Sequence, residues 1–257
     1  MARWPLKEFL RRLLPKTVRS HRIITGRLRG FRMVTSWHDY PAGILGTTER
    51  PLLDWFERNV RPGETWLDVG AHYGYTAIAL CRLVGRKGRV FAFEPSLATA
   101  GHLARTRTLN NFRRLAILPF GLGSPNTLQS YELPTLRGMM DSTSTLSVGS
   151  KEPLLLARFD WLWSLICDGE RRIDGVKVDA QGMELEILRG MTLILREFAP
   201  KLVIELHRGV ERGRLLDLLE SLGYSRACLP VDPRRQEAQA EYLDDNSYSF
   251  QRVPTQS

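Results

Sequence analysis

Residues 67–80 read LDVGAHYGYTAIAL, and this stretch decides the fold class. An apolar run ends in Asp68, and Gly70 and Gly74 follow four positions apart before a second apolar run begins. Glycine has no Cβ atom, so it allows positive φ angles and a close approach of the backbone to a ligand. The pattern predicts a buried strand, a sharp turn and a helix whose first N–H groups face an anionic group.

Apolar runs of strand length alternate with helical patterns along the rest of the chain. The expected strands span residues 65–69, 89–94, 115–120, 174–180, 200–207, 224–230 and 246–253. The expected helices span residues 49–60, 76–84, 97–111, 183–195 and 213–223. This alternation is typical of a mostly parallel sheet that helices cover on both faces.

Residues 121–153 interrupt the alternation with a stretch rich in Gly, Ser, Thr and Pro. Long irregular segments of compact domains are often functional. Because this segment should leave the sheet at the carboxyl end of a strand, we expect a flap on the substrate side. A tolerated surface insertion is the alternative.

The positive charge of the chain is concentrated at its N-terminus. Residues 1–35 hold ten Lys and Arg against one acid, Glu8, whereas the remainder holds 27 basic and 27 acidic residues. A neutral body argues against an enzyme that binds nucleic acid through a broad basic face. The basic segment indicates an anionic partner, such as a membrane, a glycolipid, a nucleic acid or a protein, or else it is a solvated helix.

Two regions follow from these patterns. Residues 1–48 form a basic extension, with an amphipathic helix at its start and a hairpin or edge strands at 25–37, and residues 49–257 form the main domain. No apolar stretch approaches the 18 or so residues typical of a membrane span. The N-terminus also lacks the unbroken apolar segment and the small-residue cleavage site of a secretory signal.

The three cysteines, Cys81, Cys167 and Cys228, are scattered along the chain. Such spacing favours buried thiols in a reducing cytosol over a disulfide framework or a metal site. We therefore expect a cytoplasmic protein without a bound metal, in peripheral contact with a membrane if the basic segment binds one.

The residues around the glycine turn distinguish two classes of ligand. A dinucleotide site has the pattern G-x-G-x-x-G, whereas Gly70 and Gly74 give G-x-x-x-G and Asp68 would repel a pyrophosphate. A ligand with an ammonium or sulfonium cation suits Asp68, and S-adenosylmethionine carries both. Glu94 ends the strand at 89–94 and can accept both ribose hydroxyls, unless it caps a helix or faces solvent.

Several segments together resemble the FkbM-type S-adenosylmethionine-dependent methyltransferases, and the resemblance covers about residues 26–224. The matching segments are LDVGAHYGYTA, VFAFEPS, the Leu-Asn-Asn helix end at 109–111, GVKVDAQGMELEILRGM and PKLVIELH. The most specific of them is the fourth-strand segment, where the matching positions are Lys177, Asp179, Gly182, Glu184, Leu188 and Gly190. The resemblance implies a Rossmann-like fold, with a seven-stranded sheet whose last strand is antiparallel. It also implies methyl transfer to oxygen, usually to a hydroxyl of a sugar or natural product.

The resemblance also implies which residues bind the cofactor. Asp68, Gly70 and Gly74 would line the pocket, and Glu94 would hold the ribose. His72 stands where the family commonly has Asn, and it either reaches the cofactor's carboxylate or simply occupies the turn.

Catalytic candidates stand at the ends of the fourth and fifth expected strands. Asp179 can contact the acceptor hydroxyl, and Lys177 lies on the same strand face, because side chains alternate along a strand. Glu205 and His207 end the next strand, and a histidine is a natural proton acceptor near neutrality. A structural ion pair and a hydrogen-bonded surface histidine are the alternatives. Gln181 replaces the family's Glu and lacks its charge.

These observations favour an S-adenosylmethionine-dependent O-methyltransferase that acts on a sugar, a glycolipid or a secondary metabolite. The alternative is a non-catalytic binding or scaffold protein on the same fold, which acts through its basic N-terminal segment. A nicotinamide-dependent dehydrogenase is a third reading, and the glycine spacing argues against it.

Overall fold

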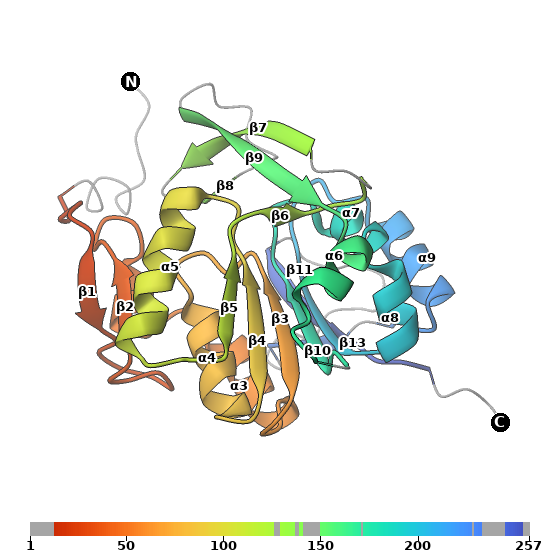
Figure 1. The fold of residues 1–257 in the computed structure, drawn as a ribbon, viewed down its shortest axis with the longest axis horizontal. Helices are drawn as coiled ribbons and strands as arrows, with labels where there is room; N and C mark the ends of the chain where they lie inside the picture. The colour runs from red at the N-terminus through yellow and green to blue at the C-terminus, as the bar shows by residue number, and fades with distance from the viewer. Residues whose placement is uncertain are drawn as a thin grey trace.

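The computed structural model describes residues 13–125, 129–136, 139–140, 150–170, 172–227, 229–232 and 245–253. Figure 1 shows a central sheet flanked by helices, with strands β7 and β9 of a second sheet across the top of the picture. The expected amphipathic helix near the N-terminus falls largely on residues 1–12, which lie outside the described part of the chain.

The central sheet has seven strands in the order β12-β13-β11-β10-β3-β4-β5. Their bounds are β3 (Thr65–Val69), β4 (Arg89–Phe93), β5 (Leu115–Leu118), β10 (Gly175–Val178), β11 (Lys201–Leu206), β12 (Leu229–Pro230) and β13 (Asn246–Phe250). Strands β11, β10, β3, β4 and β5 pair in parallel, and β13 is antiparallel to both β11 and β12. The expected Rossmann-like sheet with an antiparallel last strand is confirmed.

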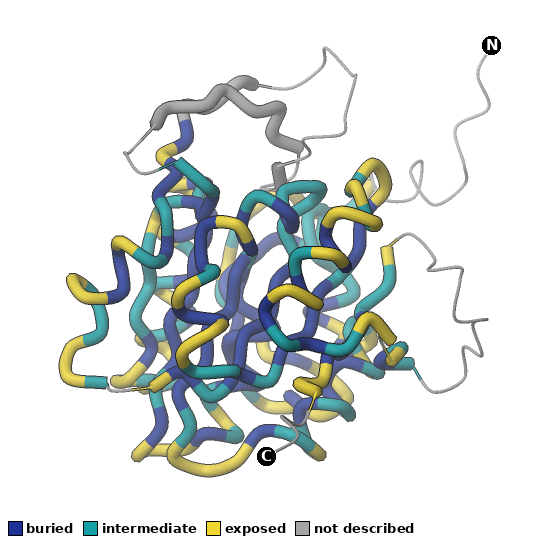
Figure 2. Tube along the Cα trace, turned by 90° about the vertical axis from the view of Figure 1, so that its right-hand side faces the viewer, coloured by how far each residue is buried: buried dark blue, intermediate teal, exposed yellow. Residues whose placement is uncertain are grey.

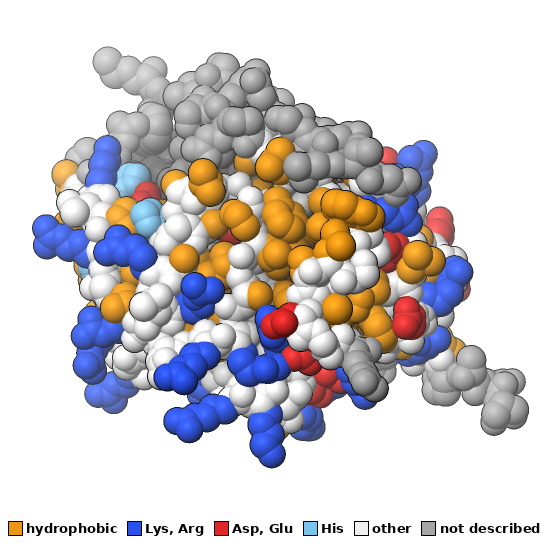
Figure 3. Space-filling model, in the orientation of Figure 1, with side chains coloured by type: hydrophobic (Ala, Val, Ile, Leu, Met, Phe, Trp, Pro, Cys, Tyr) orange, Lys and Arg blue, Asp and Glu red, His pale blue; other side chains and the backbone are white. Residues whose placement is uncertain are grey.

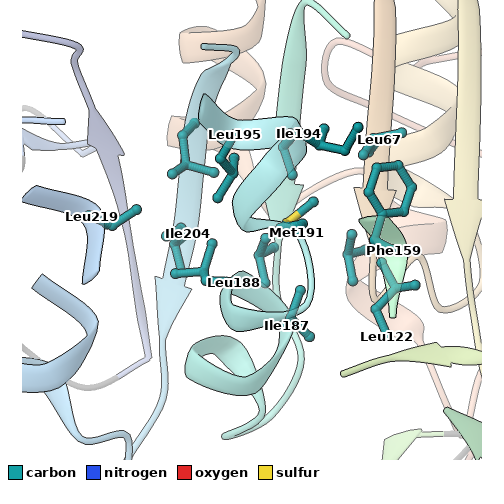
Figure 4. Close-up of a cluster of buried hydrophobic side chains, with 14 of the residues drawn as sticks. Leu67, Leu122, Phe159, Ile187, Leu188, Met191, Ile194, Leu195, Ile204 and Leu219 are labelled. Carbon is teal, nitrogen blue, oxygen red and sulfur yellow. The ribbon is translucent and has the colours of Figure 1, made fainter. Parts of the chain in front are cut away.

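Alternation of side chains along the strands explains the two layers of helices. Leu67 and Phe91 point into the cluster formed by α6 (Phe159–Ile166), α7 (Glu184–Arg189), α8 (Thr192–Phe198) and α9 (Arg212–Ser221). Trp66 and Val90 point into the opposite cluster, formed by α3 (Arg50–Asn59), α4 (Tyr75–Val84) and α5 (Leu97–Leu109). Figure 4 shows Leu67, Met191 and Ile204 within the first cluster. Burial is deepest in these central strands and their flanking helices (Figure 2).

The described N-terminal segment packs into the same core as the sheet. Strands β1 (Arg19–Arg22) and β2 (Arg32–Thr35) form an antiparallel hairpin, so the predicted hairpin is present but starts earlier than residue 25. The side chain of Asn110, the residue after α5, accepts a hydrogen bond from the Arg32 N–H and donates to the Arg32 carbonyl. A short helix, α2 (Pro41–Leu45), then leads into α3.

Three expectations of secondary structure are wrong in detail. Among the described residues, the strand expected at 224–230 is only β12, which has two residues, Leu229–Pro230. The helix expected at 183–195 is two helices, α7 and α8, because the first ends at Gly190, where a Cβ atom would lie 1.9 Å from the carbonyl oxygen of Gly123. The stretch 121–153 was expected to be irregular, yet it contributes strands to a second sheet of order β6-β9-β7-β8. These strands are β6 (Gly121–Leu122), β7 (Gln129–Leu136), β8 (Met139–Met140) and β9 (Ser150–Ala157).

No helix within the described ranges is long and apolar enough to cross a membrane. On the face shown in Figure 3, Lys and Arg side chains gather along the left and lower margins, and apolar side chains form a band across the middle. Basic charge is therefore also present on the body of the protein, where acids balance it in number.

Candidate active site

The turn between β3 and α4 brings the backbone close to the next strand of the sheet. Gly70 has φ +77°, and a Cβ atom there would lie 1.8 Å from the carbonyl oxygen of Asp179. Gly74 has φ +91°, and its Cβ would lie 2.2 Å from the Leu103 side chain. His72 between them also has a positive φ, +49°. Both glycines are thus required by space as well as by backbone conformation.

A cavity of about 280 Å³ lies at the carboxyl ends of β3, β4 and β10. Three of the residues predicted to bind the cofactor, Gly70, His72 and Glu94, line it. Leu122 of β6 and Leu156 of β9 add an apolar wall, so part of the second sheet borders this cavity. That position accords with the expected flap, whose role on the substrate side stays a prediction.

Glu94 is held in place beside the cavity. Its side chain is buried, and its two carboxylate oxygens accept hydrogen bonds from the backbone N–H groups of His72, at 2.8 Å, and Ser96, at 2.9 Å. Burial raises the pKa of Glu94 to about 7, although both hydrogen bonds lower it. A carboxylate oxygen offers more than one lone pair, so each can still accept from a ligand hydroxyl.

Asp68 lies one layer below the cavity surface. It is fully buried; one oxygen accepts a hydrogen bond from the Thr76 hydroxyl at 2.8 Å, and the other lies 3.3 Å from Lys177 Nζ. Lys177 also lies 3.3 Å from Asp179 Oδ2 and donates to the Gly70 carbonyl at 3.1 Å. Asp68 therefore supports the turn through Lys177, and its direct contact with a cofactor stays a prediction.

The predicted pair of Lys177 and Asp179 is present. Burial opposes the charge on Lys177, but the neighbouring Asp179 and Asp68 outweigh it and hold the Lys177 pKa above its usual range. Burial likewise opposes the charge on Asp179, yet Lys177 and His207 keep the Asp179 pKa below its ordinary value. Both groups are accordingly charged near neutral pH.

His207 lies behind Asp179 and Glu205, and a buried carboxylate fixes its ring. Its Nδ1 donates to Glu184 Oε1 at 2.7 Å, while its Nε2 lies 3.6 Å from Asp179 Oδ1 and 3.5 Å from Glu205 Oε1. The Gln181 amide nitrogen is 2.9 Å from the same Nε2. The four catalytic candidates, Lys177, Asp179, Glu205 and His207, are therefore brought together, although they come from two strands.

The electrostatics of this group alter the proton-acceptor prediction for His207. Burial lowers its pKa, but the hydrogen bond to Glu184 and the charge of Asp179 raise it to about 9. Burial and the charge of Asp179 raise the pKa of Glu205 to about 8. The raised pKa favours protonated His207 near pH 7, so its part as a base stays a prediction that the local charges do not favour.

Sequence reasoning did not single out Tyr40 and Glu49 as cavity residues. Tyr40 comes from residues 1–48 and Glu49 from the first position of the main domain, and both line the same cavity as Gly70 and Asp179. Glu49 has a positive φ, +53°, and burial raises its pKa. No motif spacing links these positions to the glycine turn, so only the packing of the segment against the sheet reveals them.

A second cavity of about 190 Å³ adjoins the first. Glu49 and Glu205 line both cavities, so these two carboxylates stand at the boundary between them. Asp245 and Ser247, at the start of β13, contribute to the far wall of the second cavity. The two cavities therefore share a boundary formed by Glu49 and Glu205.

The sheet order and the cavity at its carboxyl edge define the class of this protein as a Rossmann-like α/β protein of the methyltransferase type. Residues 68–226 match the family described as the Methyltransferase FkbM domain. Because this match spans more than half of the chain, the protein belongs to the FkbM methyltransferase family.

Individual proteins similar to this chain were also found. The hexuronic acid methyltransferase AglP of Haloferax volcanii is 31% identical over 156 residues, which are 59% of this chain and 59% of the relative. The FkbM methyltransferase of Methylobacillus flagellatus KT has a TM-score of 0.48 and 19% identity, over 79% of this chain and 51% of that one. Fibrillarin of Aeropyrum pernix, solved with S-adenosyl-L-methionine, has a TM-score of 0.49 and 14% identity, over 91% and 87% of the two chains. The chain thus spans little more than half the length of the first two proteins.

Proposed function

We propose that this protein transfers a methyl group from S-adenosylmethionine to a hydroxyl of a sugar-containing acceptor. The observation that carries the proposal is the cavity between the glycine turn and Glu94, in a chain that belongs to a methyltransferase family. A buried polar group without a partner in the described part of the chain also belongs to a residue that lines the cavity. The Tyr75 hydroxyl is buried and has no hydrogen-bond partner among the described residues, and Tyr75 lines the cavity.

The residues around the first cavity suit the parts of this cofactor. Glu94 would accept the two ribose hydroxyls, because its carboxylate already stands at the end of β4 with both oxygens oriented. The N-terminus of α4, beginning at Tyr75, would receive the carboxylate of the methionine part, since its first N–H groups lack partners within the helix. The acidic wall formed by Asp179, Glu49 and Glu205 would favour the sulfonium cation.

The reaction needs alignment of two ligands more than it needs a covalent partner on the enzyme. An oxygen lone pair of the acceptor forms the new O–CH₃ bond as the S–CH₃ bond breaks, and the sulfonium becomes a neutral thioether. The hydroxyl proton passes to a carboxylate of the cavity wall, where Glu49, Asp179 and Glu205 are placed. The second cavity would hold the acceptor, because Glu49 and Glu205 border it as well.

A sugar acceptor is supported by the relative named as a hexuronic acid methyltransferase. A hexuronic acid carries hydroxyls and a carboxyl group, which yield a methyl ether and a methyl ester respectively. Asp179 lines the first cavity beside the boundary between the two cavities and stays charged, so a neutral hydroxyl suits the reacting position better than a second carboxylate.

Calorimetry with S-adenosylmethionine and its demethylated product tests the cofactor assignment. Glu94→Ala and Asp68→Ala should each weaken binding at least about tenfold, since each removes either a ribose contact or the support of the turn. The control is Asp217→Asn on the exposed face of α9, which should bind as the wild type does. Unchanged affinity in both Glu94→Ala and Asp68→Ala would remove the assignment.

Product chemistry tests the acceptor. The protein is incubated with isotope-labelled S-adenosylmethionine and matched pairs of glucosides and glucuronosides, and the products are weighed by mass spectrometry. A mass increase of one methyl group that survives mild alkali indicates an ether, whereas an ester is hydrolysed. Methylation found only as alkali-labile ester would contradict transfer to a hydroxyl.

A further inference from the structure

We infer that Asp179, Glu205 and His207 form a binding site for a divalent transition-metal cation at the junction of the two cavities. One ligand atom of each residue lies within 4.8 Å of the others. The measured separations are 3.6 Å from His207 Nε2 to Asp179 Oδ1 and 3.5 Å from the same nitrogen to Glu205 Oε1. Metal–ligand bonds of about 2.0–2.2 Å place neighbouring ligand atoms roughly 3.0–3.6 Å apart, so this spacing needs little rearrangement.

Each of the three side chains is held from behind by a second group. Glu184 Oε1 accepts from His207 Nδ1 at 2.7 Å, which leaves Nε2 to face the carboxylates. Lys177 holds Asp179 Oδ2 at 3.3 Å, so Asp179 Oδ1 is the oxygen that faces His207. The Ser247 hydroxyl lies 3.5 Å from Glu205 Oε2, on the side away from Glu205 Oε1. A carboxylate behind a ligating histidine, and fixed orientation of the other ligands, are the usual surroundings of a bound metal.

The position of Asp179, Glu205 and His207 at the cavities supports a bound cation more strongly than their residue types do. Asp179 and Glu205 line the first cavity, and Glu205 also lines the second, so the convergent atoms stand where a methyl donor and an acceptor would meet. The rest of the surroundings is acidic, since Glu49 lines both cavities and Asp68 is paired with Lys177. A cation that takes the place of the His207 Nε2 proton would be attracted by the carboxylates of Asp179 and Glu205.

The donor set selects the kind of cation. Two carboxylate oxygens and one imidazole nitrogen suit Mn²⁺ or Zn²⁺ better than Ca²⁺ or Mg²⁺, which prefer oxygen alone. The Gln181 amide, now 2.9 Å from His207 Nε2, would have to turn away or present its oxygen to the cation. Binding would also require the His207 Nε2 position to be free of its proton.

The role of the cation rests on the proposed function. An acceptor hydroxyl bound to the cation would lose its proton more readily, because a bound cation lowers the pKa of a coordinated O–H group. Asp179 and Glu205 would then be occupied as ligands, and Glu49 is the carboxylate of the shared wall that remains to take the proton. The site would thus hold the acceptor oxygen beside the methyl donor.

Manganese binding tests the site without any measurement of activity. The full chain is freed of metal with a chelator and titrated with Mn²⁺, followed by electron paramagnetic resonance, with and without the demethylated cofactor product. We expect one Mn²⁺ per chain, displaced by Zn²⁺ and not by equal amounts of Mg²⁺. Asp179→Asn and Glu205→Gln should each weaken binding at least tenfold, whereas Asp217→Asn on the exposed face of α9 should not change it.

Glu184→Gln separates positioning from general stability. This residue touches the histidine and not the cation, so its amide should weaken Mn²⁺ binding roughly 10–100-fold while cofactor-product binding is retained. If the variants fail to fold, paramagnetic broadening in the wild-type protein decides, because bound Mn²⁺ should broaden the His207 ring signals first.

Two results would overturn the cation site. One is the absence of stoichiometric Mn²⁺ and Zn²⁺ binding by the wild-type protein, and the other is equal binding by wild type, Asp179→Asn and Glu205→Gln. Cofactor binding is titrated separately, so the two proposals fail separately. A chain that binds S-adenosylmethionine but no Mn²⁺ refutes the cation site alone, and one that binds Mn²⁺ but not S-adenosylmethionine refutes the proposed function alone.

Discussion

Under the proposed function, the single buried carboxyl group of Glu94 links cofactor binding to pH. It stands beside the cavity with a pKa of about 7, so half of it is protonated near neutrality in the ligand-free protein. Only the ionised form offers all of its oxygen lone pairs to two ribose hydroxyls. A ligand that selects the ionised form binds more weakly wherever that form is the minor one.

The affinity for S-adenosylmethionine should therefore fall as the pH is lowered through 7. With a pKa of about 7, the ionised fraction is near one at pH 8 and about one-tenth at pH 6, so binding should weaken roughly tenfold between them. Calorimetry at several pH values measures this. In Glu94→Gln the dependence should be nearly flat, and an equally steep curve in that variant would assign the titration to another group.

Gly70 is expected to be the least replaceable residue of the turn. Gly70→Ala places a Cβ atom 1.8 Å from the Asp179 carbonyl oxygen, in addition to the strain of φ +77°. Gly63→Ala is a matched control, because Gly63 has φ +89° and nothing within 4 Å of its Cβ position. Gly70→Ala should lower the free energy of unfolding by at least about 2 kcal/mol more than the control. Equal losses in chemical denaturation would show that the clash is relieved.

At the scale of elements, the central strands are joined by a buried ion pair as well as by their ladder. Lys177 of β10 stands opposite Asp68 of β3 in the parallel register, and their side chains meet at 3.3 Å. The pair lies beside the glycine turn, where Lys177 also donates to the Gly70 carbonyl. It therefore holds the ends of β3 and β10, which border the cavity, next to each other.

Removing the cation of this pair should be strongly destabilising. Lys177→Met leaves Asp68 and Asp179 without their buried partner, and the free energy of unfolding should fall by about 3–5 kcal/mol. Lys201→Met on the neighbouring strand is the control, since Lys201 pairs with Glu64 and is more exposed. That change should cost about 0–1 kcal/mol. Denaturant titration compares the two, and a small effect at Lys177 would contradict the structural part assigned to it.

Two side chains tie the hairpin of β1 and β2 to α5. Asn110, just after the helix, bonds to the backbone of Arg32. The Thr106 hydroxyl accepts from the Val34 N–H. Asn110→Ala removes two hydrogen bonds to the backbone of Arg32 and should lower stability by about 1–3 kcal/mol. Hydrogen exchange at the Arg32 amide should accelerate at the same time. The exposed residue Thr108 on the same helix serves as control, and Thr108→Ala should change stability by less than about 0.5 kcal/mol. Unaltered exchange at Arg32 would mean that other contacts hold the hairpin.

Elements were predictable where the signal is local. Short apolar runs between helical patterns predicted β3, β4, β10 and β11 almost to their ends. Parallel strands that are buried on both faces consist of nearly continuous apolar residues, so such runs are easy to recognise. The strands β7 and β9 were missed, since their antiparallel pairing joins residues as distant as Gln129 and Leu156 and leaves little trace in local composition.

Contacts between residues that are distant in sequence were also hard to predict at the site. Glu94 and the glycine turn were identified because a motif of fixed spacing carries them. The convergence of His207 and Asp179 at neighbouring strand ends was expected from the sequence, and the structure brings Glu205 to the same point. Asp68 was expected at the cavity surface and lies beneath it, since its burial depends on Thr76 and Lys177.

At the scale of the whole molecule, the N-terminal region belongs to the core and to the site. Its buried side chains Ile23, Leu28, Met33 and Ile44 pack in the same cluster as Trp66. Tyr40 and Glu49 meanwhile reach the cavity. Residues 1–48 were expected to be an extension, and their described part is continuous with the main body.

Two truncations separate the basic start of the chain from this packed region. Deleting residues 1–12 removes Arg3, Lys7, Arg11 and Arg12, so sedimentation with anionic vesicles at low salt should weaken while cofactor binding is retained. Deleting residues 1–48 removes part of the core and should abolish cooperative unfolding. Vesicle binding that does not change after the short deletion would exclude a membrane role for those four residues.

The placement of Tyr40 and Glu49 suggests which part of the chain would have to change for the enzyme to accept a different methyl acceptor. Both precede the span 68–226 that matches the family, yet they line the cavity that this span helps to form. Under the proposed function, exchange of the region upstream of this span would alter one part of the cavity wall and keep the donor pocket. Grafting residues 13–60 between two such enzymes should transfer selectivity and leave the donor affinity of the recipient intact.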